Sequence, residues 1–379
     1  MDPGDGSIQS TWLTRIEMII SLVKVRKMTG EILEKTLKEI QPLDEKAMEE
    51  SRLRWRNMAK PLNSMGLFEK VSVQLAGIYG KAMFSTGKKG LLIMCADNGI
   101  VEEGVTQSDQ SVTATVAENF LDDHSCVAVM CRQCGADFRP IDIGMATDTR
   151  VEKHKIAYGT KNLTKGPAMT REEAISAIEV GIKLALEMKE QGYEMLATGE
   201  MGIGNTSTSS AMTSVLLNKP VEDVTGRGAG LSSDGLERKI SAIKRGIEIN
   251  HPDPNDAIDV LAKVGGLDIA GMAGIFLGCA AAHIPGVIDG FVSGAAALAA
   301  KRICPPAGDY MIASHVSNEP AGRMILEGLE KEPFITAQMC VGEGTGAVAL
   351  FPLLEVGLAV YRNMISFNEA KIETYVPLK

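Results

Sequence analysis

A glutamate flanked by glycines is the residue of this 379-residue chain that is best suited to chemistry. Glu343 lies in the run Val341-Gly342-Glu343-Gly344-Thr345-Gly346-Ala347, which leads into the largely apolar stretch 348–360. Glycines on both sides let the backbone approach a ligand closely and leave the acid uncovered, which favours a carboxylate presented at a pocket. A glutamate at a glycine-rich turn can also be a helix cap or a loop charge.

Two further glycine runs have the pattern of phosphate-binding loops. The run 198–207 (TGEMGIGNTS) follows the apolar strand candidate 195–197 and precedes a helical pattern through Met212 and Val215. This order points free backbone N–H groups and a helix N-terminus at a phosphate. The run 225–231 (TGRGAGL) adds Arg227 to a second such loop, and Asp234 follows where a helix should begin. With one isolated base candidate, the loops predict a phosphorylated small molecule attacked under general-base control, although such glycines can also serve only tight strand-to-helix packing.

The cysteines and histidines do not indicate a metal site. Seven cysteines at irregular spacing are typical of a reducing compartment and not of a disulfide framework. Cys131 and Cys134 have CxxC spacing, but no second pair or nearby histidine cluster completes a zinc site. We therefore expect neither a metal nor a cofactor.

Four more motifs make the chain similar to the nicotinate-nucleotide:dimethylbenzimidazole phosphoribosyltransferase family. They are residues 95–105 (CADNGIVEEGV), 265–272 (GGLDIAGM), 288–291 (IDGF) and 314–319 (SHVSNE). Together with the three glycine runs they occur in the family's order, and the resemblance extends from Pro61 to Phe367.

The resemblance implies a reaction as well as a fold. It implies transfer of the phosphoribosyl group of nicotinate mononucleotide onto a ring nitrogen of 5,6-dimethylbenzimidazole, with inversion to an α-ribotide, for cobamide biosynthesis. Because the donor already carries a cationic pyridinium leaving group, its departure needs neither an acid nor a metal. The reaction needs a base for the proton of the attacking acceptor, and the match to the family's Gly-Glu-Gly motif assigns this role to Glu343.

The remaining site residues are predicted in three groups. Those expected to bind the nucleotide phosphate are Gly202, Gly204, Asn205, Thr206, Ser207, Gly228 and Gly230. Glu200 and Asp289 each follow a strand candidate and suit ribose hydroxyls, although either could be a helix cap. The acceptor pocket is expected to include Asp97, Asn98, Val105, Gln107, Ser314 and His315.

The acceptor block departs from the family's pattern. Asn98 stands where the resemblance leads us to expect histidine in Asp-His-Gly, and residues 108–113 lack the usual proline. Related enzymes of some anaerobic bacteria act on phenol or p-cresol as heterodimers of two paralogous subunits, and loss of a hydrogen-bonding histidine could accompany that change. Another alternative is a non-catalytic paralogue that completes a partner's site, but the intact Gly342-Glu343-Gly344 argues against it.

The elements that must position these residues alternate along the chain. Short apolar runs at 91–96, 138–143, 195–198, 286–288 and 310–313 are separated by helical segments, of which Thr170–Gln191 and Asp234–Ile249 are the clearest. The alternation predicts an α/β fold with a parallel sheet covered by helices on both faces, and with ligands outside the carboxyl ends of the strands. The uncharged segment 269–288 is interrupted by Pro285-Gly286, so we expect a buried helix and a strand there instead of a membrane span.

The domain and partner predictions come partly from the resemblance. It implies a Rossmann-like α/β domain over residues 66–347 and a small helical domain from both chain ends, 1–65 with 348–379, the first part of which shows helical periodicity from Trp12 to Lys60. It also implies a homodimer, or a heterodimer with a paralogue, with the active site near the subunit interface. The chain has 39 Lys+Arg against 48 Asp+Glu and no basic stripe, so nucleic acid is not an expected partner. The first residues lack the order of a signal peptide, which predicts a cytoplasmic protein without membrane attachment.

Overall fold

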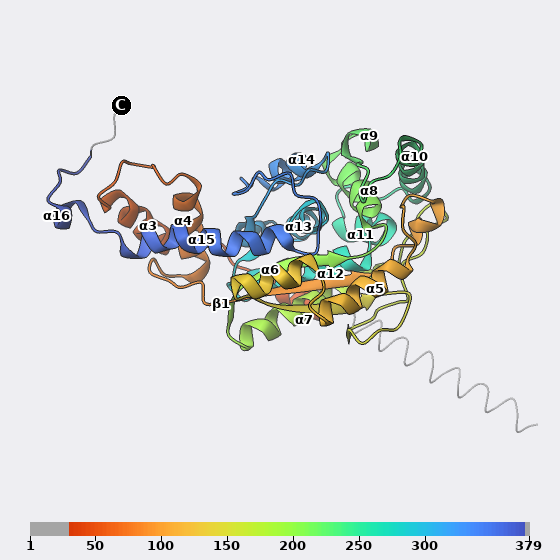
Figure 1. Ribbon diagram of the computed structural model, residues 1–379, viewed down its shortest axis with the longest axis horizontal. Coiled ribbons are helices and arrows are strands. Elements are labelled where there is room, and N and C mark those ends of the chain that lie inside the picture. Colours follow the sequence, from red (N-terminus) through yellow and green to blue (C-terminus); the bar gives the residue numbers. More distant parts are fainter. Residues whose placement is uncertain (1–29, 376–379) are drawn as a thin grey trace, which may run out of the picture.

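The computed structural model describes residues 30–375 (Figure 1). The part of the predicted helical segment between Trp12 and residue 29 lies outside the described residues. Within them, a sheet with its helices forms the larger part of the molecule, and a smaller group of helices stands beside it (Figure 1).

A six-stranded, wholly parallel sheet is the centre of the larger part, with strand order β3-β2-β1-β4-β5-β6. The strands are β1 Lys88–Ala96, β2 Asp137–Gly144, β3 Glu152–Lys153, β4 Tyr193–Met201, β5 Gly286–Ile288 and β6 Met311–Ala313. Residues 90–96 of β1 are all buried, as expected for a strand covered on both faces. The chain leaves β1 toward β2 on one side and returns to β4 on the other, so the boundary between β1 and β4 is the switch point at which such sheets bind ligands.

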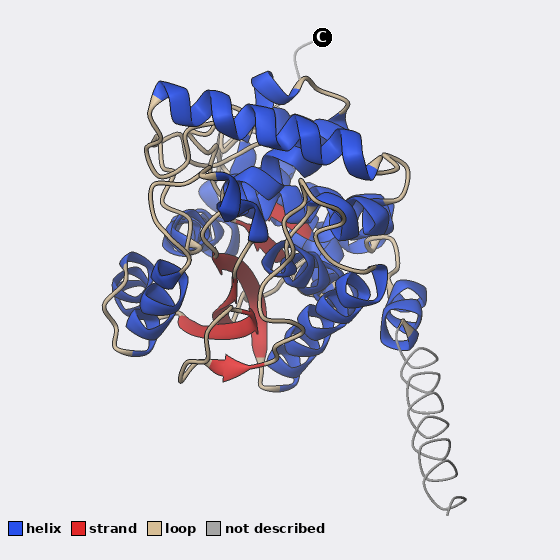
Figure 2. Cartoon of the chain, turned by 90° about the vertical axis from the view of Figure 1, so that its right-hand side faces the viewer, coloured by secondary structure: helices blue, strands red, loops and turns tan. Residues whose placement is uncertain are grey.

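Helices cover both sides of the sheet (Figure 2). The α-helices of the described chain are α2 Glu31–Glu39, α3 Glu45–Asn57, α4 Leu67–Tyr79, α5 Ser111–Leu121, α6 Cys126–Cys134, α7 Arg171–Glu190, α8 Asn205–Leu217, α9 Val221–Val224, α10 Ser233–Asn250, α11 Ala257–Val264, α12 Leu267–Ala281, α13 Phe291–Ile303, α14 Gly322–Leu329, α15 Thr345–Asn363 and α16 Phe367–Ala370. Two 3-10 helices, η1 Gly99–Glu103 and η2 Pro305–Tyr310, complete the order. The predicted α/β class with a parallel sheet and helices on both faces is thus confirmed.

Helices α7 and α12 pack closely because glycines lie where they cross. A Cβ atom on Gly181 would clash with the backbone oxygen of Gly271, and one on Gly274 would clash with the backbone oxygen of Ile178. Helix α12 is buried from Leu267 to Ala280, which confirms the buried helix predicted for the uncharged segment. Helix α7 begins with the capping box of Thr170 and Glu173, as its sequence indicates.

Helices α3 and α4 and the C-terminal half of α15 form the smaller helical group (Figure 1). The Trp55 indole donates to Ser72 Oγ over 2.6 Å, and its ring lies 5.1 Å from that of Tyr361 on α15. Helix α15 is the one helix of residues 30–375 with the length and apolar composition of a membrane span, and 56% of that stretch is buried inside the structure. It therefore behaves as a core helix that joins the two parts.

The domain boundaries predicted at residues 65/66 and 347/348 stay a prediction. Helix α4, which lies on the large-domain side of the first boundary, packs against α3 and α15. Helix α2, on the other side, packs against α7 and α12.

Candidate functional site

A cavity of about 310 Å³ lies where the loops after β1, β4, β5 and β6 converge. The predicted site residues that line it are Val105, Gln107, Glu200, Gly202, Gly204, Asn205, Thr206, Gly228, Asp289, His315 and Glu343. Four of the segments follow β1, β4, β5 and β6, and the loops at Gly228 and Glu343, which follow α9 and α14, complete the lining.

Glu343 is held in a left-handed backbone conformation, with φ of 62° between Gly342 at 82° and Gly344 at 95°. A side chain at Gly342 would clash with the Glu200 carboxyl group, so the glycine before the acid is required by close packing as well as by its φ. The Glu343 Oε2 atom accepts a hydrogen bond from the backbone N–H of Val127 over 3.0 Å. Glu343 thus lines the cavity, and its Oε2 atom is turned toward the first turn of α6.

Asp289 holds the other end of the same loop. Its carboxyl oxygens accept from the backbone N–H groups of Gly344, Gly346 and Ala347, at 3.2, 2.7 and 3.1 Å. Gly344 is the N-cap residue of α15 and the other two lie in its first turn, so Asp289 caps that helix although it also lines the cavity. Burial raises the pKa of Asp289 to about 7 against the lowering effect of these hydrogen bonds.

Glu200 and Asp268 form a buried pair of acids bridged by one amide. The Asn205 Nδ2 group donates to Glu200 Oε2 and, over 3.1 Å, to Asp268 Oδ2. Burial, and then the Asp268 charge, raises the pKa of Glu200 to about 8, while burial raises that of Asp268 to about 7. Glu200, the member of the pair that lines the cavity, therefore keeps its proton to a higher pH than an ordinary glutamate does.

Lys239 is a cavity residue that the sequence did not single out. Its Nζ donates to Thr206 Oγ1 over 2.9 Å and to the Gly226 backbone oxygen over 3.1 Å, which places a cation between the two predicted phosphate loops. Burial lowers its pKa to about 8, and the Glu319 charge opposes that shift. The available signal was a lysine on the buried face of the amphipathic helix α10, beside Ala242 and Ile243.

Three predicted residues near the cavity do not line it. Ser207 is fully buried in α8, and Ser314 is fully buried while its Oγ donates to the Asp289 backbone oxygen over 3.0 Å. Gly230 lies beside the lining, and its backbone oxygen accepts from the Gln107 amide. Any part that these residues take in binding is therefore indirect in this structure.

Asp97 and Asn98 lie behind the cavity wall. A Cβ atom on Gly204 would come within 3.2 Å of Asn98 Cβ, so Asn98 packs beneath the glycine loop and does not face the cavity. Asp97 Oδ2 accepts from the Ala146 N–H over 2.8 Å. Both side chains are almost fully buried because the loops after β2 and β4 cover them.

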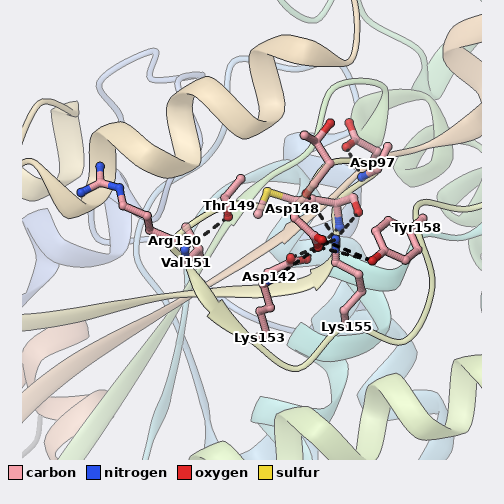
Figure 3. Close-up of polar contacts among 12 residues, drawn as sticks. Asp97, Asp142, Asp148, Thr149, Arg150, Val151, Lys153, Lys155 and Tyr158 are labelled. Atoms are coloured by element: carbon pink, nitrogen blue, oxygen red, sulfur yellow. Dashed lines mark hydrogen bonds and ion pairs between the residues drawn. The ribbon is translucent and has the colours of Figure 1, made fainter.

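Figure 3 shows the polar cluster that fixes the loop behind Asp97. Lys155 Nζ donates to the backbone oxygens of Met145 and Thr147, at 2.8 and 3.2 Å, and lies 3.2 Å from the buried Asp142 Oδ2. On the other side, the Ile203 N–H of the glycine loop donates to Thr113 Oγ1 over 3.1 Å. The cavity wall therefore rests on a second layer of charged and hydrogen-bonded residues.

His315 lines the cavity beside Asp289. Its Nδ1 lies 3.1 Å from Ser314 Oγ and 3.9 Å from Asp289 Oδ1, and burial lowers its pKa. Across residues 30–375, no group of three or more His, Cys, Asp or Glu is placed to hold a metal ion.

Comparisons of the chain with known proteins all find members of the same family. A family model described as phosphoribosyltransferase matches residues 40–372. The nicotinate-nucleotide–dimethylbenzimidazole phosphoribosyltransferase of Acetivibrio thermocellus is 47% identical over 349 residues, which is 91% of this chain and 99% of that protein. The protein of the same name from Clostridium acetobutylicum is 46% identical over 92% of this chain and 99% of its own length. The crystal structure of CobT from Thermus thermophilus superposes with a TM-score of 0.83 at 36% identity, over 86% of this chain and 99% of that one.

Proposed function

The chain belongs to the nicotinate-nucleotide–dimethylbenzimidazole phosphoribosyltransferase family, and from this premise we propose a reaction for the cavity. The enzyme transfers the phosphoribosyl group of nicotinate mononucleotide to an aromatic base, with inversion to an α-ribotide, in cobamide biosynthesis. One observation supports this proposal above all: Glu343, two glycine loops and the buried Lys239 lie at the same cavity.

The donor phosphate binds between the two glycine loops. Residues Gly202–Thr206 and the loop at Gly228 line this part of the cavity, and Lys239 supplies the positive charge. The N-terminus of α8, which begins at Asn205 after Gly204, adds its partial positive charge. Glu200 and Asp289 lie beside the ribose, where a neutral Glu200 carboxyl group donates to a ribose oxygen.

Glu343 is the general base. It accepts the proton of the acceptor while the acceptor nitrogen attacks the anomeric carbon and the neutral nicotinate ring leaves. A positioned carboxylate contributes about 10²- to 10⁴-fold to such a step, and alignment of the two substrates in one cavity contributes further.

The acceptor is a flat aromatic ring that packs against the apolar side chains of Val105, Val116 and Met201 in the same cavity. Phenol or p-cresol remains the second candidate, because Asn98 replaces the expected histidine. The position of Asn98 behind the wall, beneath Gly202 and Gly204, weakens that link, because its side chain is not among those that line the cavity. We therefore favour a nitrogen base.

A product assay tests the proposal. The purified chain is incubated with nicotinate mononucleotide and an equimolar mixture of dimethylbenzimidazole, adenine, phenol and p-cresol, and the ribotides are separated. We expect α-ribotides of the nitrogen bases. Phenolic products would instead assign the phenol-accepting branch, and no product from the chain alone would favour a non-catalytic paralogue that needs a partner subunit.

Assembly and location form part of the same proposal. We infer a cytoplasmic enzyme that acts as a homodimer, or as a heterodimer with a paralogue, as its membership of this family implies. Sedimentation of the purified chain, with and without a co-expressed paralogue, distinguishes these assemblies.

A further inference from the structure

We propose that the N-terminus of α6 positions the catalytic base, with the Val127 backbone N–H as the positioning group. This inference rests on the proposed role of Glu343. The N–H lies 3.0 Å from Glu343 Oε2, and the two residues are 216 positions apart in the chain. It is the one contact in the described hydrogen bonds through which a helix outside the Glu343 loop holds that side chain.

The first turn of α6 is arranged for this contact. Ser125 is the N-cap, and its Oγ accepts from the Ala128 N–H over 3.1 Å. The Val127 N–H would have no partner within the helix, because the first N–H groups of any α-helix lack one. The carboxylate of Glu343 satisfies it, and the partial positive charge of the helix end attracts that carboxylate.

The contact fixes a side chain that otherwise has several rotamers. The backbone of the base is already fixed, because Asp289 holds Gly344 N–H over 3.2 Å and Glu343 itself has φ of 62°. The side chain has three further rotatable bonds, and the Val127 N–H selects the rotamers that bring Oε2 to α6. Engagement of Oε2 leaves Oε1 to take the proton of the acceptor.

Proline substitution removes the N–H while keeping the helix start. Val127→Pro deletes the donor within the first turn, where proline is tolerated, and Cys126→Pro places the same ring one residue earlier as the matched control. We expect Val127→Pro to lower kcat by about tenfold or more with both KM values unchanged within about twofold, because misplacement of a catalytic group affects the chemical step. Cys126→Pro keeps the wild-type kcat. Equal kcat values for the two variants would overturn the proposal.

A second pair of variants keeps the test decisive if Val127→Pro does not fold. Cys126 is exposed at the first position of α6, so Cys126→Asp places a competing carboxylate at the helix start and Cys126→Asn is its neutral counterpart. We expect a lower kcat for the aspartate variant alone. The same kcat in both would remove the positioning role.

Glu343→Gln separates this inference from the proposed function. If that variant keeps near-normal turnover, the base assignment itself is lost. If it is inactive while Val127→Pro matches wild type, the base assignment stands and only the positioning role fails.

Discussion

At the scale of single residues, Glu343 carries the clearest prediction. Glu343→Gln keeps the size of the side chain and can still accept from the Val127 N–H, so the fold is retained. It cannot take a proton from the acceptor, and we expect kcat to fall by about 10²-fold or more. Initial rates with saturating donor and acceptor measure this, with circular dichroism as the control for folding. Wild-type turnover in the folded variant would show that another group is the base.

Lys239 carries a prediction about the donor alone. Lys239→Gln removes the buried cation between Thr206 and Gly226, and we expect the KM for nicotinate mononucleotide to rise far more than that for the acceptor. Because the pKa of Lys239 is lowered to about 8, the lysine loses its charge as pH rises through that value, and kcat/KM for the donor falls with it. The variant should lack this alkaline decline. An equal rise in both KM values would contradict a phosphate role.

The sequence indicated which loops form the site but not which side chains face the cavity. The glycines around Glu343, Gly202 and Gly228 predicted loops at a cavity, because close approach of backbone to ligand needs them. The same pattern does not say which side chains face inward. Asn98 and Ser207 lie behind the wall and Lys239 faces the loops, since orientation depends on how helices from distant segments pack.

At the scale of elements, the pair α7 and α12 carries a stability prediction. Gly181→Ala places a methyl group against the Gly271 backbone oxygen, which cannot move without shifting α12. We expect the free energy of unfolding to fall by about 1–3 kcal/mol, as for other overpacked cores. Urea denaturation measures it, with the exposed Lys183→Ala on the same helix as the control. Equal urea midpoints for Gly181→Ala and Lys183→Ala would show that α7 and α12 can move apart at little cost in stability.

The strands and helices that the sequence predicted have patterns that extend over only a few residues. Short apolar runs located five strands, and Thr170 with Glu173 located the start of α7, because these signals act within a few residues. The two-residue β3 had no such signal. Its place depends on Ile141 and Asp142 of β2, with which it pairs, and on the loop that Lys155 fixes.

At the scale of the whole molecule, buried acids at the cavity should set the pH dependence of stability. Burial raises the folded-state pKa of Glu200 to about 8, and those of Asp268 and Asp289 to about 7, above their ordinary values of 4.5 and 3.8. An acid with a raised pKa is protonated in the folded state, so its stabilising effect is complete below the unfolded pKa and is lost as pH rises through the folded one. Glu355 acts in the opposite direction, since Thr86, Arg362 and Lys89 lower its pKa to about 2, but its contribution changes only below about pH 4.5.

Between pH 5 and 7 the three raised acids are opposed, within residues 30–375, only by the lowered pKa of His315, whereas near pH 8 the lowered pKa of Lys239 begins to add stability as pH rises. The unliganded protein should therefore become less stable as pH rises from 5 to 7, and urea midpoints at pH 5, 6 and 7 measure this trend. Asp268→Asn removes one titrating group from the pair with Glu200 and should flatten the decline, because the remaining acid no longer meets a charged neighbour. A midpoint that rises with pH, or the same slope in the variant, would show that these carboxyl groups are ionised in the folded enzyme. The site would then hold several negative charges before the donor binds, which is difficult to reconcile with tight binding of an anionic nucleotide.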